Sequence, residues 1–337
     1  MIKKTLRSLL LAGWLLAGAG AAQAQADYLL YGVADLSYGR FEPSGQIPEN
    51  RVNSNSLTAS FAGLNLKYGF DGGWVVGTTL ETFIRFQDGR LGRRNDDPIL
   101  SRNAFVSVSN AGYGLVRVGR LQSYLFDATI RFNAMGNAIA FGPAARHVFL
   151  AGNLQGVQGD FYWDRAISYS TPNMEGVTVN LMHAQADKDI TGGLTGGSLV
   201  VAKGLFAMSL AAQQVKLDDG FTVPATRETA VQLGTLYNFG LLRVFGQFTA
   251  TRDLGLDVRS KIVSAGANLA LGPGNVLFQM ATTQATGPAV DRKHTSLAGG
   301  YQWSYDSVTD IYLLAMDDRV KGQTRGVSAA LGVRYKF

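Results

Sequence analysis

The feature that most constrains this chain is a two-residue alternation of apolar and polar side chains through most of its length. In the last segment the apolar face consists of Val327, Ala329, Leu331, Val333, Tyr335 and Phe337. The same period runs through 228–239 and 261–271. A helix would scatter these side chains around its surface, whereas successive residues of a strand point to opposite faces. The alternation therefore predicts an all-β chain.

The alternation stops for one long interval, Leu121 to Asp160. Intervals of this length without a pattern are uncommon in a regular chain, and they are often functional. We therefore expect the alternating segments to form a wall. The interval 121–160 is expected to fold into the space that this wall encloses.

The first residues have the composition of an export signal. Lys3, Lys4 and Arg7 precede an apolar run from 9 to 22, and Ala22-Gln23-Ala24 offers a small-residue cleavage site. We predict a signal peptide at 1–24 and a single domain at 25–337, with cleavage after Ala26 as the close alternative. The formal charge of +6 includes the three leader cations, so the mature chain carries +3 and a nucleic-acid partner is not expected. Cysteine is absent, so the exported chain must be stable without disulfides.

A soluble β-sandwich would also alternate, but three features favour a membrane barrel. These are the export signal, segments near the ten or so residues of a tilted spanning strand, and aromatic residues gathered at segment ends. The end aromatics are Tyr28, Tyr31, Tyr68, Phe70, Trp74, Tyr237, Phe239, Tyr301, Trp303, Tyr335 and Phe337. The polar face carries Ser, Gln, Asn and Arg, which a water-filled lumen satisfies and a dry core would not. We predict a transmembrane antiparallel β-barrel.

About sixteen segments can be counted, and bacterial outer-membrane barrels have an even number of strands. They span 28–38, 57–69, 74–88, 99–109, 114–121, 160–171, 176–187, 196–202, 205–217, 227–239, 241–252, 257–271, 274–286, 293–305, 307–317 and 324–337. Tight breaks such as 71–73 and 272–274 alternate with longer, more charged breaks such as 40–56 and 89–98. This asymmetry predicts short turns at one end of the barrel and external loops at the other.

Short motifs in these segments resemble the general porins of Gram-negative bacteria, most closely those of the β-proteobacterial type. The motifs are Tyr31-Gly32-Val33-Ala34-Asp35, Leu80-Glu81, Val118-Gly119-Arg120, Ser168-Tyr169-Ser170-Thr171-Pro172 and Gly332-Val333-Arg334-Tyr335-Lys336-Phe337. The resemblance covers essentially the whole mature chain. It implies a homotrimer of sixteen-stranded barrels in the outer membrane, among its lipids and lipopolysaccharide. Each barrel would be a passive, water-filled channel for small hydrophilic solutes, and the terminal Tyr335 and Phe337 would be the signal that the barrel assembly machinery reads.

The resemblance also implies that the third external loop, 121–160, folds inward and narrows the pore. Glu81 matches the family's wall acid on the third strand, and Asp127 matches the acid near the start of the loop. Arg120 matches the basic residue where the fifth strand becomes the loop, and Arg102 the one that begins the fourth strand. The full candidate set at the constriction is Arg85, Arg102, Arg117, Arg120, Arg131, Arg165, Glu81, Asp127, Asn133, Asn137 and Asp35.

Strand parity supports part of this set. Glu81 and Arg85 share the lumen face of their strand, and Arg117 shares that of the fifth strand with Gly119. Arg102 instead has the parity of Val106, so it faces the pore only if the strand end or a bulge reorients it.

Departures from the family pattern give an expectation about ion selectivity. Thr58 and Tyr162 stand where the family usually has arginines, with Arg165 three residues after the latter. Asn133 and Asn137 stand where the loop usually carries acids, with Arg131 beside them. A narrow opening with fixed positive charge concentrates anions and repels cations. We therefore expect anion preference.

Other readings of the charges remain open. Each arginine alone could be a solvated rim charge, because salt screens charges away from a constriction. The cluster of Arg90, Arg93 and Arg94 reads as an exposed loop that could bind lipopolysaccharide phosphates or a neighbouring subunit. A substrate-specific channel for oxyanions or organic acids is the alternative function, and a plugged barrel serving as an adhesin or scaffold is a further one.

Neither a cofactor nor a metal is expected. His147, His183 and His294 are far apart in the sequence and have no partners at metal-ligand spacing. The glycine-rich run 192–198 lacks the lysine and helix of a phosphate-binding loop and reads as an external loop. A barrel enzyme is the remote alternative, because nothing in the spacing of Ser123, Asp127 and His147 enforces a catalytic geometry.

Overall fold

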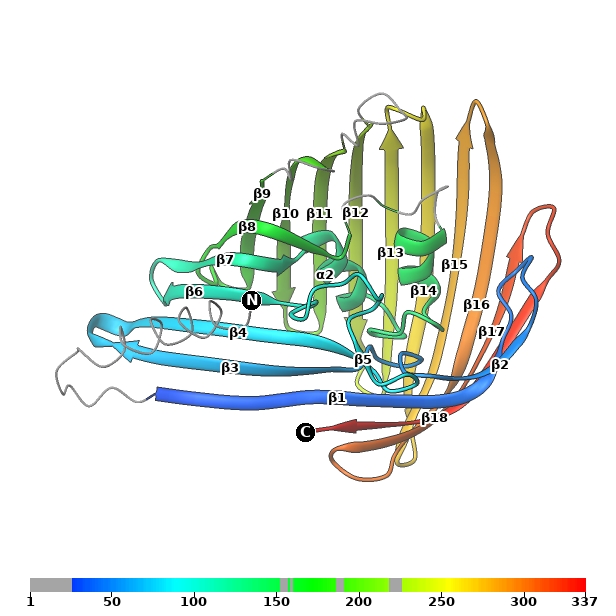
Figure 1. Ribbon diagram of the computed structural model, residues 1–337, viewed down its shortest axis with the longest axis horizontal. Coiled ribbons are helices and arrows are strands. Elements are labelled where there is room, and N and C mark those ends of the chain that lie inside the picture. The colour runs from blue at the N-terminus through cyan, green and yellow to red at the C-terminus, as the bar shows by residue number, and fades with distance from the viewer. Residues whose placement is uncertain (1–25, 152–156, 158–159, 186–190, 218–225) are drawn as a thin grey trace, which may run out of the picture.

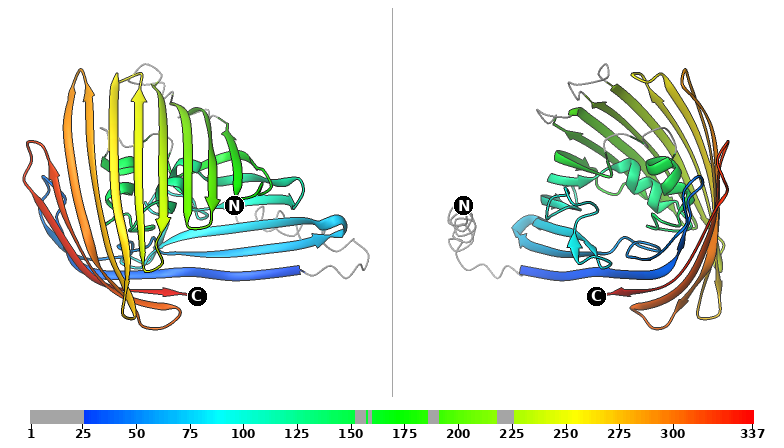
Figure 2. Two further views of the ribbon diagram at one scale, coloured as in Figure 1. Left: turned by 180° about the vertical axis from the view of Figure 1, so that it is seen from behind. Right: turned by 45° about the vertical axis from the view of Figure 1, so that its right-hand side comes forward.

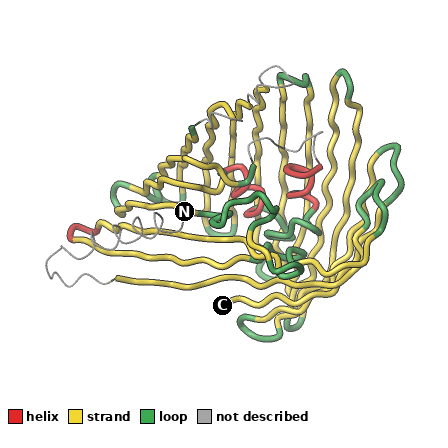
Figure 3. The backbone as a smooth tube through the Cα atoms, in the orientation of Figure 1, coloured by secondary structure: helices red, strands yellow, loops and turns green. Residues whose placement is uncertain are grey.

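The computed structural model describes residues 26–151, 157, 160–185, 191–217 and 226–337. The signal peptide predicted at 1–24 lies outside these residues. The chain forms one antiparallel sheet that closes on itself (Figures 1 and 3). The first strand, β1 (Ala26–Phe41), pairs on one side with β3 (Phe61–Phe70) and on the other with the last strand, β18 (Gly326–Lys336).

Between β3 and β18 each wall strand is antiparallel to the next. These strands are β4 (Trp74–Arg85), β6 (Ala104–Asn110), β7 (Gly114–Gln122), β8 (Tyr162–Ser170), β9 (Val177–Ala184), β10 (Thr191–Lys203), β11 (Phe206–Leu217), β12 (Thr226–Asn238), β13 (Leu242–Asp253), β14 (Val258–Leu271), β15 (Gly274–Gly287), β16 (Val290–Ser304) and β17 (Thr309–Val320). Two short strands, β2 (Glu49–Asn53) and β5 (Arg90–Leu91), add to β1 and β4 within the first two long loops. Within the described ranges the sheet has eighteen strands, and sixteen remain without these two additions. The predicted sixteen-stranded barrel is confirmed.

The two faces of the wall differ as the alternation predicted. Along β14, Ile262 and Ser264 are buried on the inward face, whereas Val263 and Leu269 are exposed on the outward face. Tight connections join the strands at one end, and one of them is the short 3₁₀ turn η1 (Asp71–Gly73). We call this end the turn side and the opposite end, with the longer loops, the loop side.

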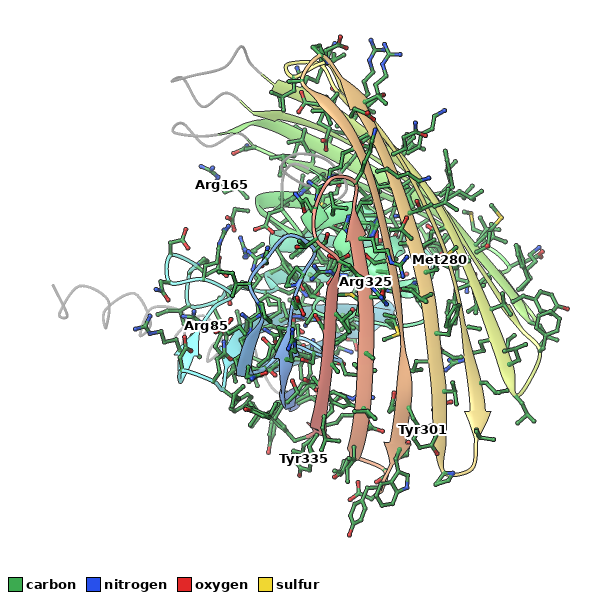
Figure 4. All side chains as sticks on the ribbon, turned by 90° about the vertical axis from the view of Figure 1, so that its right-hand side faces the viewer. Arg85, Arg165, Met280, Tyr301, Arg325 and Tyr335 are labelled. Atoms are coloured by element: carbon green, nitrogen blue, oxygen red, sulfur yellow. The ribbon has the colours of Figure 1, made fainter. Side chains whose placement is uncertain are left out.

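Aromatic rings gather on the turn side. The rings of Tyr237 and Phe239 lie 4.4 Å apart, and Trp303 contacts Tyr305. Figure 4 shows Tyr301 and Tyr335 at the same end of the barrel. Tyr31 departs from the expected ring of end aromatics, because it points inward and donates its hydroxyl proton to Glu81.

The described residues of the interval 121–160 form two helices and a π-helical turn inside the curve of the sheet (Figure 2). These are α2 (Tyr124–Arg131), α3 (Pro143–Ala145) and η2 (Arg146–Ala151). The hydroxyl of Ser123 accepts a hydrogen bond from the backbone N–H of Phe126, which caps the start of α2.

The inserted loop is seated on one half of the wall. Helix α2 contacts β10, β11 and β12, and α3 contacts β14, β15 and β16. Phe132 is fully buried over Gly234, where the absence of a side chain makes room for the ring. Apolar clusters join Leu125 and Val148 of the loop to wall residues such as Ile262. Burial of these side chains stabilises the loop against the wall.

The structure corrects two details of the expected strands. The run 192–198 is part of β10 and not an external loop, because its glycines face bulky neighbours: a Cβ at Gly196 would lie 3.0 Å from the Trp163 ring. The strand expected at 57–69 begins only at Phe61. No helix in the described part of the chain is long and apolar enough to cross a membrane.

Candidate pore constriction

Three cavities lie between the inserted loop and the surrounding strands. The loop-side cavity has a volume of about 520 Å³ and is lined by Asn55, Arg94 and Asn137, among others. A first turn-side cavity of about 340 Å³ includes Arg131, and a second of about 350 Å³ includes both Arg131 and Asn137. The second turn-side cavity shares Asn137 with the loop-side cavity and Arg131 with the first turn-side cavity, so the three lie next to one another along the inserted loop. We refer to these three cavities together as the path.

The wall opposite the loop carries a compact group around Glu81. Oε1 of Glu81 lies 2.6 Å from Nη1 of Arg102 and accepts the hydroxyl proton of Tyr31, while Oε2 accepts a hydrogen bond from the Asn103 amide. The guanidinium of Arg102 lies over the Phe61 ring, 4.0 Å from its centre. In β6 the even-numbered residues face outward, but Arg102 lies before the first residue of that strand, Ala104. Its side chain therefore does not follow the alternation of β6 and points inward to Glu81.

Two further candidate arginines lie on β7. Arg117 donates from Nη2 to the Tyr124 hydroxyl at 2.7 Å, which links the wall to α2. After Gly119 the pairing of β7 with β8 shifts by one residue. Arg120 then donates to Asp164 at 2.6 Å and to the Ser101 carbonyl. Arg120 therefore holds the strand end in place and exposes little of its side chain.

On the inserted loop, Asp127 and Arg131 form a half-exposed ion pair of 3.1 Å. Asn133 is buried, and its amide group bonds the backbone of Met135 and Gly136 within the loop itself. Asn137 lines two of the three cavities.

The second and third external loops are joined by Arg93. Its guanidinium donates two hydrogen bonds of 2.6 Å to the carboxylate of Asp160, and it also pairs with Asp97. Burial by itself would raise the pKa of Asp160, but these bonds hold it below its usual range. Arg85 bonds Asn95 and Asp88 of the second loop, so it lies with that loop (Figure 4).

Two other candidate residues, Asp35 and Arg165, do not line any of the three cavities. Asp35 is fully buried and accepts hydrogen bonds from the Tyr312 hydroxyl and the backbone of Thr58. Arg165 is exposed on β8 with a φ of 50°.

Sequence reasoning missed two arginines that line the second turn-side cavity, Arg243 and Arg334. Arg334 donates to Asp310 at 2.7 Å and to the Thr58 hydroxyl at 2.8 Å, so a guanidinium does lie beside Thr58. Arg243 makes no ion pair with any described residue. Arg243 is two residues from Phe245 on β13, so the two side chains share the inward face. This alternation was a signal in the sequence that could have identified Arg243.

Three of the paired charges share an orientation that the pairs Arg93–Asp160 and Arg120–Asp164 do not share, because in those two the acid is the more exposed member. In each of three pairs the acid side chain is less exposed than its arginine: 5% against 14% for Glu81 and Arg102, 3% against 15% for Asp310 and Arg334, and 3% against 19% for Asp97 and Arg93. The guanidinium groups thus stand between the carboxylates and the lumen. Among the described residues, the lining of the three cavities includes seven arginines and two aspartates: Arg93, Arg94, Arg102, Arg117, Arg131, Arg243 and Arg334, with Asp127 and Asp160.

The histidines are closer in space than their sequence spacing suggested. His147 of η2 stacks on His294 of β16 with 4.0 Å between ring centres. His147 also bonds the hydroxyls of Thr283 and Ser296, which ties the loop to the wall. No group of three or more potential metal ligands converges in the part of the chain that the structure covers.

A closed barrel with an apolar outer face, a polar inner face and a loop seated in its lumen defines a channel that spans a membrane. The chain belongs to the Gram-negative porins, since the model of that family matches residues 10–323. It is 30% identical over 323 residues to outer membrane porin protein 32 of Delftia acidovorans, covering 88% of this chain and 85% of that protein. The protein is therefore an outer-membrane channel, as its motifs predicted.

Solved structures share the fold at low sequence identity. The anion-selective porin from Comamonas acidovorans matches with a TM-score of 0.79 and 22% identity over 93% of this chain and all of that one. The trimer form of OmpT from Vibrio cholerae matches with a TM-score of 0.70 and 12% identity over 94% of this chain and all of that one.

Proposed function

We propose that this porin passes small hydrophilic solutes by passive diffusion with a preference for anions. The observation that carries the proposal is the excess of arginines over acids in the cavity linings, together with the three pairs in which the acid is less exposed than its arginine. In a narrow, poorly screened opening such charges concentrate anions and repel cations. A structural relative is described as an anion-selective porin, which agrees with the proposal. No catalytic step is included, because diffusion through a water-filled pore requires none.

The test is the zero-current potential of the purified protein in a planar bilayer under a potassium chloride gradient. We expect a chloride-directed potential that shrinks in Arg131→Gln and grows in Asp127→Asn, because these two residues are opposite members of one pair in the path. Arg325→Gln is the matched control, since Arg325 lies exposed outside the three cavities and pairs with Asp317. A potassium-directed potential in the unaltered protein would refute anion preference and leave the channel itself unaffected.

A second candidate is a channel with a weak site for oxyanions or organic acids. Arg243 and Arg334 line the second turn-side cavity together with amide side chains such as Asn275 and Gln302. Guanidinium and amide groups are the donors that suit a multiply charged oxyanion. Concentration-dependent block of chloride current by phosphate or a dicarboxylate, lost in Arg243→Gln, would support this version. Current that is simply additive would exclude it.

We infer that the protein works as a homotrimer. The resemblance to general porins supports this, and a related structure is described as a trimer form. The measurement is the mass of the detergent-solubilised protein, with a single-barrel mass contradicting the inference. We also propose that 1–24 directs export and that Tyr335 and Phe337 are read by the barrel assembly machinery.

A further inference from the structure

The loop-side cavity differs from the two turn-side cavities in the chemistry of its lining. Its apolar lining residues include four phenylalanines and an isoleucine: Phe83, Phe126, Ile139, Phe149 and Phe161. The first turn-side cavity is lined mainly by hydroxyl, amide and charged side chains, such as those of Thr79, Asn103 and Gln122. Apolar surface in a water-filled lumen is poorly hydrated, so a solute with an apolar part can displace this water favourably. The loop-side cavity is therefore suited to a solute that is not polar throughout.

Three of these rings pack against one another, and we call them the aromatic group: Phe126, Phe149 and Phe161. The rings of Phe126 and Phe161 are stacked with 4.6 Å between their centres, and Phe149 meets them edge-on at 5.3 and 5.0 Å. Phe126 belongs to α2, Phe149 belongs to η2, and Phe161 directly precedes β8. Phe126 and Phe149 are each only 6% exposed, so their rings are held in place. The aromatic group is a preformed surface for a further ring, because aromatic rings attract one another in stacked and edge-on arrangements.

Arg94 supplies a cation to the same cavity. Its guanidinium lies 3.6 Å from the carboxylate of Asp96 and 3.7 Å from that of Asp97, which is beyond hydrogen-bonding distance. The other two arginines that line this cavity, Arg93 and Arg102, each lie 2.6 Å from a carboxylate oxygen. Among the described arginines of this lining, Arg94 therefore keeps its donors available. A guanidinium binds a carboxylate through two parallel hydrogen bonds.

Two amide side chains complete the polar part of the lining, Asn55 and Asn137. The side-chain oxygen of Asn55 accepts a hydrogen bond from the backbone N–H of Ser60, so its NH₂ group is the part that can donate to a ligand. Asn137 lies on the inserted loop and makes no side-chain hydrogen bond to any described residue. A mainly apolar lining with a few polar groups is typical of small-molecule sites, and the volume of about 520 Å³ lies within their usual range of about 300–1,000 Å³.

We propose that the loop-side cavity binds aromatic carboxylates, anions in which a carboxylate is attached to a single aromatic ring. The ring lies against the aromatic group, and the carboxylate binds Arg94 and the amides of Asn55 and Asn137. This site rests on the proposed anion preference, because the solute enters the pore as an anion. A weak site of this kind raises the concentration of the solute at the loop side of the pore and still releases it, as conduction requires.

The experiment measures the block of chloride current by benzoate in a planar bilayer that contains the purified protein, at neutral pH, where benzoate is ionised. Acetate and cyclohexanecarboxylate at the same ionic strength are the comparisons, since the first has no ring and the second has a saturated ring. We expect benzoate to halve the chloride conductance at a concentration about tenfold below that of acetate, because burial of the ring adds apolar contact. Cyclohexanecarboxylate should be intermediate, because it offers apolar area without an aromatic face.

Two substitutions test the two parts of the site separately. Arg94→Gln should raise the half-blocking concentration of benzoate about tenfold, equivalent to the loss of one charge-assisted hydrogen bond. Phe161→Leu should raise this concentration about threefold, whereas Phe161→Tyr should leave it unchanged because the ring is kept. Each value is referred to the chloride conductance of the same variant before benzoate is added. Arg90→Gln is the matched control, because Arg90 lies in the same external loop as Arg94, bonds Asn95 and does not line the cavity.

Equal half-blocking concentrations of benzoate and acetate, or an unchanged value for benzoate in Arg94→Gln or Phe161→Leu, would overturn the proposal. Equal block by benzoate and cyclohexanecarboxylate would overturn the assignment to aromatic solutes. The zero-current potential in potassium chloride alone separates this site from the proposed function. A chloride-directed potential without a preference for benzoate would remove only the site, whereas a potassium-directed potential would overturn the anion preference on which the site depends.

Discussion

At the residue scale, the pore chemistry depends on which member of each ion pair faces water. Glu81 is nearly buried and is held by Arg102, Tyr31 and Asn103, so its charge acts on the lumen from behind the guanidinium. The same arrangement recurs at Asp310 behind Arg334. A carboxylate placed this way orients its arginine and reduces the field of that arginine only in part.

This leads to a prediction for Glu81→Gln. Removal of the buried negative charge leaves Arg102 uncompensated, so the zero-current potential should shift further toward chloride. The loss of a charged hydrogen-bonding partner should also cost about 1–3 kcal/mol of stability. Glu49→Gln is the control, because Glu49 forms an exposed pair with Arg51 in the first loop. Unchanged selectivity in Glu81→Gln would show that the pair does not contribute to the field in the pore.

A second prediction concerns the space beneath Phe132. A Cβ at Gly234 would lie 2.6 Å from the Phe132 ring, so Gly234→Ala should push the end of α2 away from β12. We expect a destabilisation of about 1–3 kcal/mol and a changed single-channel conductance. Gly246→Ala on β13 should behave as the unaltered protein, because its Cβ would meet only the Thr235 hydroxyl at 3.2 Å. Equal single-channel conductance in Gly234→Ala and Gly246→Ala would mean that the position of Phe132 over Gly234 does not determine the conductance of the pore.

At the element scale, the inserted loop carries a buried histidine, His147, that is bonded to the wall. His147 is buried against the wall, and this burial, with the nearby His294 ring, lowers the pKa of His147 well below 6.5. The neutral ring bonds Thr283 and Ser296. A detached loop would bind a proton more readily than a seated one, so the seated form is favoured at neutral pH and loses this advantage as the pH falls below about 6.5.

We therefore predict that acidification increases current fluctuations in single-channel recordings taken from about pH 7.5 down to about pH 4.5. In His147→Gln this dependence should flatten, since the titrating group is gone. His183→Gln is the control, because His183 is exposed on β9 and bonds only Thr195 among the described residues. The same pH response in both variants would assign the effect to other groups.

The sequence allowed the wall to be predicted well because strand pleating alone fixes which side chains face the lumen. Glu81 and Arg117 were placed correctly for that reason. Arg102 could not be placed, because its direction depends on where β6 begins at Ala104. Asp35 and Asn133 were expected at the constriction, but tertiary hydrogen bonds draw the first into the wall and the second into a turn of the loop. Periodicity carries no information on such bonds.

At the scale of the whole molecule, the barrel depends on a single seam between the two ends of the described sheet. Phe337 exchanges two backbone hydrogen bonds with Gly32, and β18 pairs with β1 from Val33 to Arg40. A Cβ at Gly32 would lie 2.5 Å from both the Phe337 ring and the Phe61 carbonyl oxygen. The seam therefore requires glycine at this position.

The corresponding prediction is that Gly32→Val reduces the folded fraction after refolding into liposomes. We expect a cost of about 1–3 kcal/mol from overpacking, read as loss of the fast-migrating folded band on an unheated gel. Gly69→Val should refold normally, since a Cβ there has no neighbour within 4 Å. Normal refolding of Gly32→Val would show that the seam tolerates a wider separation.

The inserted loop is seated on one half of the wall, so amino-acid substitutions in the two halves should have different effects on the pore during evolution. On β10–β16 many inward positions pack against the loop, as Gly234 and Ile262 show, so replacements at these positions would disturb its seat, whereas Arg243 near the turns lines a cavity. On β1–β8 several inward side chains, such as Arg102 and Arg117, line the path itself. Because inward and outward positions alternate, replacements there leave the lipid-facing surface intact. Substitutions at inward positions of β1–β8 can therefore change which solutes pass through the pore during evolution. The surface that contacts the membrane stays the same.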